Sequence, residues 1–261
     1  PIAARFDCPV VFDLRQADLA AGGQGAPITP IADWILFSSE TAKRAIINLG
    51  GFCNVTILPK RSTGPTEASS HDLTEIQGFD VCACNQLLDC IAREALGVAF
   101  DDGGRAARAG TADSSTAIEL RSNLARQRRA GRSLGTGDEA LAWVRTNKAR
   151  VAPNDLAASG VSAIAATIAD AVREHRVDEL VLAGGGVRNT ALREHIAAAT
   201  AMPTALSDDH GVPIDAREAM CFAILGALCA DGVPVTLPQV TGCASPAPIS
   251  GVWCRPRGPG Q

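Results

Sequence analysis

Hydrophobic and polar positions follow two periods along this chain. Short apolar runs are typical of β-strands, and they predict strands at 9–12, 44–49, 52–58, 77–81 and 179–183. Apolar residues at helical spacing predict helices at 85–96, 114–129, 155–175, 191–199 and 216–230. Strands and helices therefore alternate, and this order predicts an α/β protein.

Two glycine clusters come directly after predicted strands. Gly50 and Gly51 lead into a second strand, whereas Gly184, Gly185 and Gly186 lead into a helix. Glycine lets the backbone approach a ligand closely, and free N–H groups in such turns suit phosphate. The two clusters favour nucleotide binding, although each on its own is also compatible with an ordinary tight turn. Gly-Gly-Gly-x-x-Asn differs from the spaced dinucleotide fingerprint, which argues against NAD.

Polar, glycine-rich segments separate the predicted elements. Residues 21–27 form a glycine-rich turn, and residues 60–72 read as an exposed loop. Gly97 is a plausible end for the helix at 85–96. The tail after Leu237 is rich in Pro, Gly and Ser and is expected to wrap the surface. No internal repeat and no linker divides the chain sharply.

Composition narrows the function classes. The 261 residues are 46% hydrophobic and 20% charged, with a net charge of −4. A polyanion partner needs a basic face, so nucleic acid is not expected. The most apolar helix, at 219–230, is shorter than the ~20 residues that span a bilayer, and no membrane partner is expected.

The cysteines fit neither a disulfide framework nor a zinc site. Cys53, Cys90, Cys221 and Cys229 lie inside apolar elements, where cysteine acts as a small hydrophobe. Cys-x-Cys at 82–84 lacks a second pair at zinc spacing. The odd count of nine predicts reduced thiols, no metal on cysteine and a cytoplasmic location. The four histidines accompany no Ser or Cys motif, so they receive no catalytic role.

A series of motifs in a fixed order carries a resemblance to a known family. They are Asp-Leu-Arg-Gln-Ala-Asp at 13–18, Gly-Gly-Gln-Gly-Ala-Pro at 22–27, Asn-Leu-Gly-Gly-Phe-Cys-Asn at 48–54, Gly-Phe-Asp at 78–80, Gly-Gly-Gly-Val-Arg-Asn at 184–189 and Glu-Ala-Met-Cys-Phe-Ala at 218–223. With these motifs the chain resembles the anhydro-N-acetylmuramic acid kinases. That family shares the actin-like fold of sugar kinases and heat-shock-protein ATPases.

The resemblance implies a fold and a reaction. The fold is the actin-like ATPase (ribonuclease H-like) class, a mixed sheet flanked by helices, seen here mostly as the C-terminal lobe. Residues 1–27 would end the N-terminal lobe and cross between lobes, and 28–261 would form the C-terminal lobe. The reaction is hydrolytic opening of 1,6-anhydro-N-acetylmuramic acid with transfer of the ATP γ-phosphoryl group to O6, with Mg²⁺. The product, N-acetylmuramic acid 6-phosphate, belongs to peptidoglycan recycling.

The resemblance also assigns site residues. Opening an internal acetal needs a base that activates water, and Asp18 is the expected catalytic base. Asp13, Gln24 and Glu218 are expected to bind the sugar. The expected ATP-binding residues are Asn48, Gly50, Gly51, Asn54, Asp80, Asn85, Gly184, Gly185, Gly186 and Asn189. From the residues alone, a helix cap or a solvated turn residue is the favoured interpretation of Asp18. For Glu218, an exposed first-turn glutamate fits as well as a sugar contact.

Two departures from the family pattern stand out. Val-Cys-Ala-Cys-Asn at 81–85 replaces the usual Thr-Gly-Pro-Gly-Asn, so that loop lacks its glycines. The family's N-terminal phosphate- and metal-binding loop has no counterpart before Pro1, so we expect the chain to lack the N-terminal part and to be inactive alone.

Other functions remain as alternatives at this point. The main one is a non-catalytic nucleotide-binding protein of the same fold. An ATPase of the heat-shock-protein kind is weaker, because it leaves residues 13–27 unexplained. The expected partners are ATP, a small amino sugar and, as one option, a second copy in a homodimer.

Overall fold

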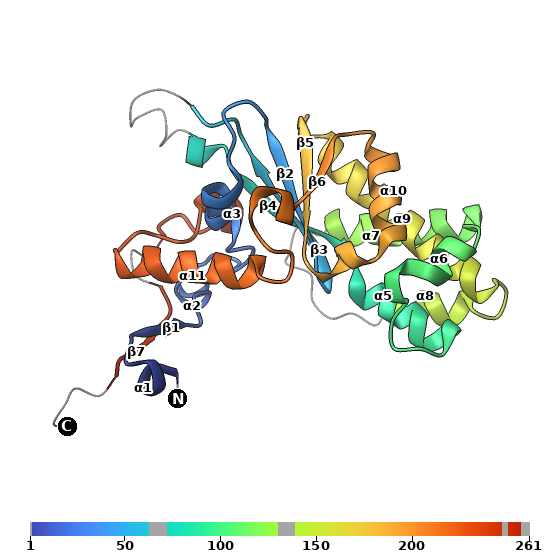
Figure 1. Ribbon diagram of the computed structural model, residues 1–261, viewed down its shortest axis with the longest axis horizontal. Coiled ribbons are helices and arrows are strands. Elements are labelled where there is room, and N and C mark those ends of the chain that lie inside the picture. The colour runs from blue at the N-terminus through green and yellow to red at the C-terminus, as the bar shows by residue number, and fades with distance from the viewer. Residues whose placement is uncertain (1, 63–71, 130–138, 247–249, 257–261) are drawn as a thin grey trace.

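The computed structural model describes residues 2–62, 72–129, 139–246 and 250–256, and its centre is a five-stranded mixed sheet (Figure 1). The strands are β2 (Arg44–Leu49), β3 (Phe52–Leu58), β4 (Gln77–Ala83), β5 (Glu179–Ala183) and β6 (Thr204–Leu206). Their order across the sheet is β4-β3-β2-β5-β6. The first three strands form an antiparallel meander, and β5 and β6 run parallel to β2.

Helices cover both faces of this sheet. One face carries α5 (Asn85–Ile91) with its π-helical extension (Ala92–Leu96), α6 (Arg105–Ala109), α7 (Ser114–Arg129), α8 (Glu139–Asn147), α9 (Pro153–Arg173) and α10 (Thr190–Thr200). The other carries α3 (Pro30–Phe37) and α11 (Arg217–Ala230). Successive strand residues point to opposite faces. Ile47 accordingly joins the large core on the α9 side, whereas Ile46 packs with Trp34 and Phe37 on the α3 side.

Helix α9 is the central helix of the larger core. Among the described residues it is the one helix long and apolar enough to cross a membrane, by length and composition. Within its most apolar window, 78% of the helix is buried inside the molecule, against β4, α7 and α10. Burial of this kind accounts for its composition.

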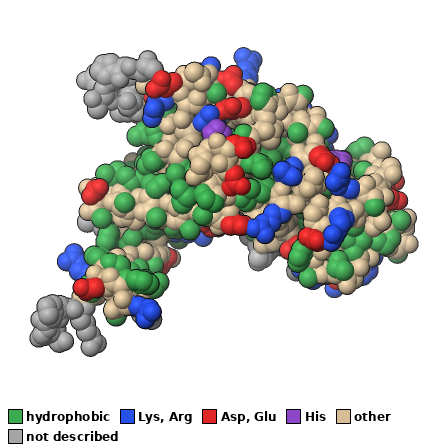
Figure 2. Space-filling view, in the orientation of Figure 1, with side chains coloured by type: hydrophobic (Ala, Val, Ile, Leu, Met, Phe, Trp, Pro, Cys, Tyr) green, Lys and Arg blue, Asp and Glu red, His purple; other side chains and the backbone are tan. Residues whose placement is uncertain are grey.

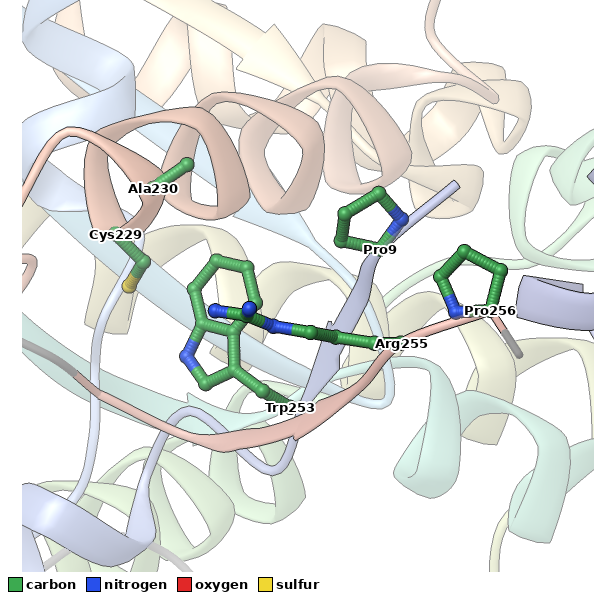
Figure 3. A pocket seen from close by; sticks show the side chains of 6 residues that line it. All are labelled: Pro9, Cys229, Ala230, Trp253, Arg255 and Pro256. Atoms are coloured by element: carbon green, nitrogen blue, oxygen red, sulfur yellow. The ribbon is translucent and has the colours of Figure 1, made fainter. Parts of the chain in front are cut away.

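The N-terminal segment and the tail pair with each other. The chain begins with α1 (Ile2–Phe6), strand β1 (Val10–Phe12) and α2 (Gln16–Ala20). Strand β1 pairs antiparallel with β7 (Val252–Cys254) from the tail, and the two strands form a ribbon. The tail, predicted to wrap the surface, thus contains α12 (Pro238–Thr241) and a strand. Figure 2 shows hydrophobic side chains gathered over this ribbon and α11. A cavity of about 560 Å³ lies between the two, lined by Pro9, Cys229, Ala230, Trp253, Arg255 and Pro256 (Figure 3).

The periodicity predicted the longer elements well. The five long helices and all five predicted strands appear within a few residues of their expected bounds, and Gly97 ends the helical stretch with a φ of 70°. Several elements that are short or have little apolar periodicity were not predicted: α1, α2, α3, α6, α8, α12, β6 and β7. Within the predicted loop at 60–72, residues 63–71 lie outside the described part of the chain.

The buried cysteines give a first testable prediction. Burial raises the pKa of the Cys84 thiol to about 12, and burial together with the Asp33 carboxylate raises that of Cys221 to about 12. Cys254 is exposed. Since the thiolate is the reactive form, iodoacetamide at about pH 8 should modify Cys254 first and the two buried thiols only after denaturation. Mass mapping of early modification at Cys84 would contradict this burial.

Candidate functional site at the edge of the sheet

The two predicted glycine turns meet at one edge of the sheet. Strands β2 and β5 are parallel neighbours, with Asn48 opposite Ala183, so the turns that follow them lie side by side. A Cβ atom on Gly184 would lie 2.6 Å from Asn48 Oδ1. A Cβ atom on Gly186 would lie 2.7 Å from Leu49 Cβ. Two segments far apart in sequence therefore form one surface.

The three positions of the second turn differ in why, or whether, the fold needs glycine there. Gly184 has a φ of +82°, and Gly186 has no room for a side chain against Leu49, so both are required by the fold itself. Gly185 is exposed, and nothing lies within 4 Å of where its Cβ would be. Only Gly185 leaves open space in which a ligand can reach the backbone.

A row of polar side chains runs across the meander beside these turns. Asn48 on β2 is the register partner of Asn54 on β3, which in turn is the partner of Asp80 on β4. Register partners share a face of the sheet. Ile46, two residues before Asn48, packs on the α3 side, so this polar row (Asn48, Asn54 and Asp80) also faces that side.

The first turn is closed onto the start of α5. The N–H groups of Asn85 and Gln86 donate to the carbonyls of Gly50 and Gly51, at 3.0 and 3.2 Å. The Asn85 amide donates to Leu49 O at 3.2 Å. These amides are therefore occupied within the protein, and the segment without the family's glycines is held as a tight junction between β4 and α5.

Asn189 and a glycine pair that sequence analysis did not single out lie together. The Asn189 side chain accepts from Leu192 N at 3.0 Å and caps α10. Gly104 lies against Asn189. Both Gly103 and Gly104 have positive φ angles, 65° and 71°. The Asp-Asp-Gly-Gly sequence at 101–104 was the available signal for this turn. The predicted nucleotide contact of Asn189 stays a prediction.

Asp18 lies beneath the turn at residues 22–27. Its side chain is 1% exposed, with Oδ2 accepting from Gly25 N at 2.7 Å and Oδ1 from Thr241 Oγ1 at 2.7 Å. Arg15 Nε donates to Gly25 O at 2.7 Å. The carboxylate therefore holds the turn in place, a structural function that the sequence did not reveal. Its predicted role as a base stays a prediction.

The other two sugar-binding predictions on this segment occupy more open positions. Asp13 is exposed, with a φ of 57°. Gln24 is exposed as well, and its N–H donates to Thr241 O at 2.8 Å. Their contacts with a sugar stay predictions.

The turn at 22–27 packs on the strand that carries Asp80. A Cβ atom on Gly78 would lie 2.6 Å from Pro30 Cγ and 3.2 Å from Pro27 Cγ. Gly78 therefore lets the chain after the turn cross β4 closely. The structure in this way brings the segments of Gln24 and Asp80, separate motifs in the sequence, into contact.

Glu218 lies in the first turn of α11, with its side chain exposed. The preceding Arg217 is 2% exposed and forms an ion pair with Asp33 of α3, which is fully buried. Burial is the largest influence on the pKa of Arg217 and lowers it, but Asp33, Cys221 and Glu218 together raise it by more, so the pKa of the guanidinium is raised overall. Arg188, in the second glycine turn, pairs with Asp215 just before this helix.

The sheet and its flanking helices define the class of protein. A mixed five-stranded sheet, covered by helices on both faces and carrying glycine turns at one edge, places the chain in the actin-like ATPase (ribonuclease H-like) fold class, as predicted. The model of the anhydro-N-acetylmuramic acid kinase family matches residues 1–254. The chain belongs to this family.

Two relatives matched by sequence agree with the family assignment. An anhydro-N-acetylmuramic acid kinase of Salinibacter ruber is 34% identical over 95% of this chain, and one of Ralstonia nicotianae is 36% identical over 97%. The chain spans only 63% and 66% of the length of these two relatives. Among solved structures, the activator of the 2-hydroxyisocaproyl-CoA dehydratase from Clostridium difficile is similar with a TM-score of 0.48 and 16% identity, covering 76% of this chain and 64% of that one.

Proposed function

We propose that the whole protein containing this chain is an ATP-dependent kinase that converts 1,6-anhydro-N-acetylmuramic acid to N-acetylmuramic acid 6-phosphate in peptidoglycan recycling. The observation that carries the proposal is the polar row Asn48, Asn54 and Asp80 beside the open backbone at Gly185. The names of the relatives support it. Residues 28–261 would then supply the ATP-binding lobe.

ATP would lie along the edge formed by the two glycine turns. Gly50, Gly51 and the polar row would take the phosphates, and the turn at 184–189 would border the adenosine. Mg²⁺ prefers oxygen ligands, and the side-chain oxygens of Asp80, Asn48 and Asn54 form a donor set of that kind on one row. When bound, the ion would neutralise phosphate charge during transfer.

The chemistry needs a water, a base and a positioned phosphate. Water adds to the anomeric carbon as its bond to O6 breaks, O6 bonds to the γ-phosphorus, and ADP leaves with the electrons of the broken P–O bond. Asp18 would accept the proton of the water. Because both of its oxygens are bonded to Gly25 and Thr241, this role requires Asp18 to exchange one of those contacts for the water.

Sugar recognition would come from the side of α3 and α11. Gln24 belongs to the turn that Asp18 holds, and Asp13 precedes that turn in the sequence. Glu218 lies at the exposed start of α11.

A cytoplasmic location fits a protein with nine free cysteines, since reduced thiols persist there. We also propose a homodimer. Its interface would include three exposed hydrophobic side chains, Phe6 of α1, Phe12 of β1 and Val252 of β7.

One assay tests the proposed function. The whole protein is incubated with Mg-ATP and the anhydro sugar, and ADP release and the mass of the sugar product are followed. We expect ADP formation that depends on the sugar, with one water and one phosphoryl group added to it. Nucleotide binding without sugar-dependent ADP release would instead support a non-catalytic nucleotide-binding protein.

A further inference from the structure

Asp33 is a buried carboxylate on which three segments of the candidate site converge. It lies in the first turn of α3 and is 0% exposed. Arg217 Nε of α11 donates to Asp33 Oδ1 at 3.1 Å, and Thr56 Oγ1 of β3 donates to Asp33 Oδ2 at 2.7 Å. Thr29, directly before α3, donates to the same Oδ2 at 3.5 Å.

Each of these contacts leads to a predicted site residue. Thr56 lies two residues beyond Asn54 on the same face of β3, so it adjoins the polar row. Thr29 follows the turn that contains Gln24. Arg217 directly precedes Glu218 in the first turn of α11. The Asp33 carboxylate therefore links the sheet, the glycine-rich turn and the helix that carries the predicted sugar-binding acid.

A buried ion pair contributes little net free energy to the stability of a fold. The desolvation cost of its two charges offsets most of their attraction, and apolar residues of similar volume often stabilise a protein as well or better. The pair sits beside an apolar cluster with Trp34 and Phe37, where such residues would fit. Its directional hydrogen bonds do something that apolar contacts cannot, because they fix the angle and depth of the first turn of α11.

We propose that the Asp33–Arg217 ion pair is a positioning device for sugar binding, which holds Glu218 at the correct place over the sheet. The inference rests on the proposed function, in which Glu218 binds the sugar. Arg217 and Asp33 do not touch the sugar in this scheme; they act through Glu218. Nucleotide binding at the glycine turns should be independent of the pair.

The test is a mutant cycle in the whole protein. The double variant Asp33→Asn with Arg217→Gln removes both charges and leaves polar groups in their place, so that no unpaired charge is buried. We expect the KM for the anhydro sugar to rise at least about tenfold. The affinity for a non-hydrolysable ATP analogue should stay within about twofold, because Asp33 reaches the polar row only through Thr56, which lies outside the predicted ATP-binding residues.

The second arm of the cycle introduces Glu218→Ala. If the pair acts through Glu218, the double change should have little further effect on sugar KM in that background, because coupled residues are not additive. Leu225→Ala is the matched control, since Leu225 is fully buried two turns further along α11 in a different cluster. It should lower the melting temperature while leaving the sugar KM near the wild-type value.

Three results would overturn the inference: an unchanged sugar KM in the double variant, full additivity with Glu218→Ala, or an equal rise in KM for Leu225→Ala at a matched loss of melting temperature. If the double variant does not fold, Thr56→Val is the alternative variant. It removes one hydrogen bond to Asp33 and should raise the sugar KM by a smaller factor, and an unchanged sugar KM in this variant also overturns the inference.

The proposed function and this inference can fail separately. A wild-type protein without sugar turnover refutes both, whereas an active wild type with an additive cycle refutes only the inference.

Discussion

Replacing Asp18 with asparagine is expected to lower sugar-dependent ADP release by the whole protein by at least ~10²-fold, the scale of losing a general base. The structure makes this substitution informative. Asparagine can keep both contacts of the aspartate, since its oxygen can accept from Gly25 N while its amide donates to the Thr241 hydroxyl. Sugar and ATP affinity should therefore change little, because the lost interaction acts in the transition state.

Two companion variants separate the base from the support of the turn. Asp18→Ala removes both contacts and leaves Gly25 N–H without a partner, which costs about 1–3 kcal/mol. Asp13→Asn should keep kcat near the wild-type value and raise mainly the sugar KM, because Asp13 is proposed to bind the sugar and asparagine tolerates the left-handed conformation at φ 57°. An active Asp18→Asn beside a damaged Asp18→Ala would make Asp18 a structural residue only. An inactive Asp13→Asn with an active Asp18→Asn would move the base to Asp13.

Replacing Gly185 with valine is expected to abolish most binding of an ATP analogue while leaving the protein folded. Nothing in the described part of the protein lies within 4 Å of a Cβ at this exposed position, so the branch point of the valine meets no neighbour in the fold. A bound nucleotide that approaches the backbone would meet it. Calorimetry with the analogue should show at least about a tenfold loss of affinity, the equivalent of about 1.4 kcal/mol.

The control for this prediction is Gly186→Ala. A Cβ at residue 186 would lie 2.7 Å from Leu49 Cβ and 2.8 Å from Leu49 O, so this change should lower the melting temperature by itself. Gly185→Val should not. Unchanged nucleotide affinity in a folded Gly185→Val protein would remove the turn at 184–189 from the site.

Local signals predicted the sheet and its edge. Short apolar runs and the glycines that follow them depend on a few consecutive residues, so the positions of β2, β3 and β5 could be read directly. That the two turns meet follows from parallel pairing of β2 with β5, which the fold class supplies. The Asp-Asp-Gly-Gly turn at 101–104 had an equally local signal and was overlooked among the charged residues around it.

Features that depend on distant partners could not be predicted. Asp18 resembles a solvated turn residue in the sequence, and its burial depends on Thr241, 223 residues away. Asp33 and Arg217 are separated by 184 residues. Asp33 stands alone as a charge in an apolar stretch, whereas Arg217 is flanked by Asp215 and Glu218. A charge in an apolar helix indicates that some partner exists, but only the packing of α11 against α3 shows which one.

The pairing of β2 with β5 has a consequence for the order in which the molecule forms. Arg44 and Glu179, at the paired ends of these strands, are 135 residues apart, whereas the meander β2–β3–β4 is local. Local contacts close early and distant ones late, because closing a long loop costs more entropy. Asn48, Asn54 and Asp80 should therefore be aligned before β5 docks on β2, and the docking of β5 brings Gly185 to them. A nucleotide that spans both turns would bind only after that step and would hold it in place by mass action.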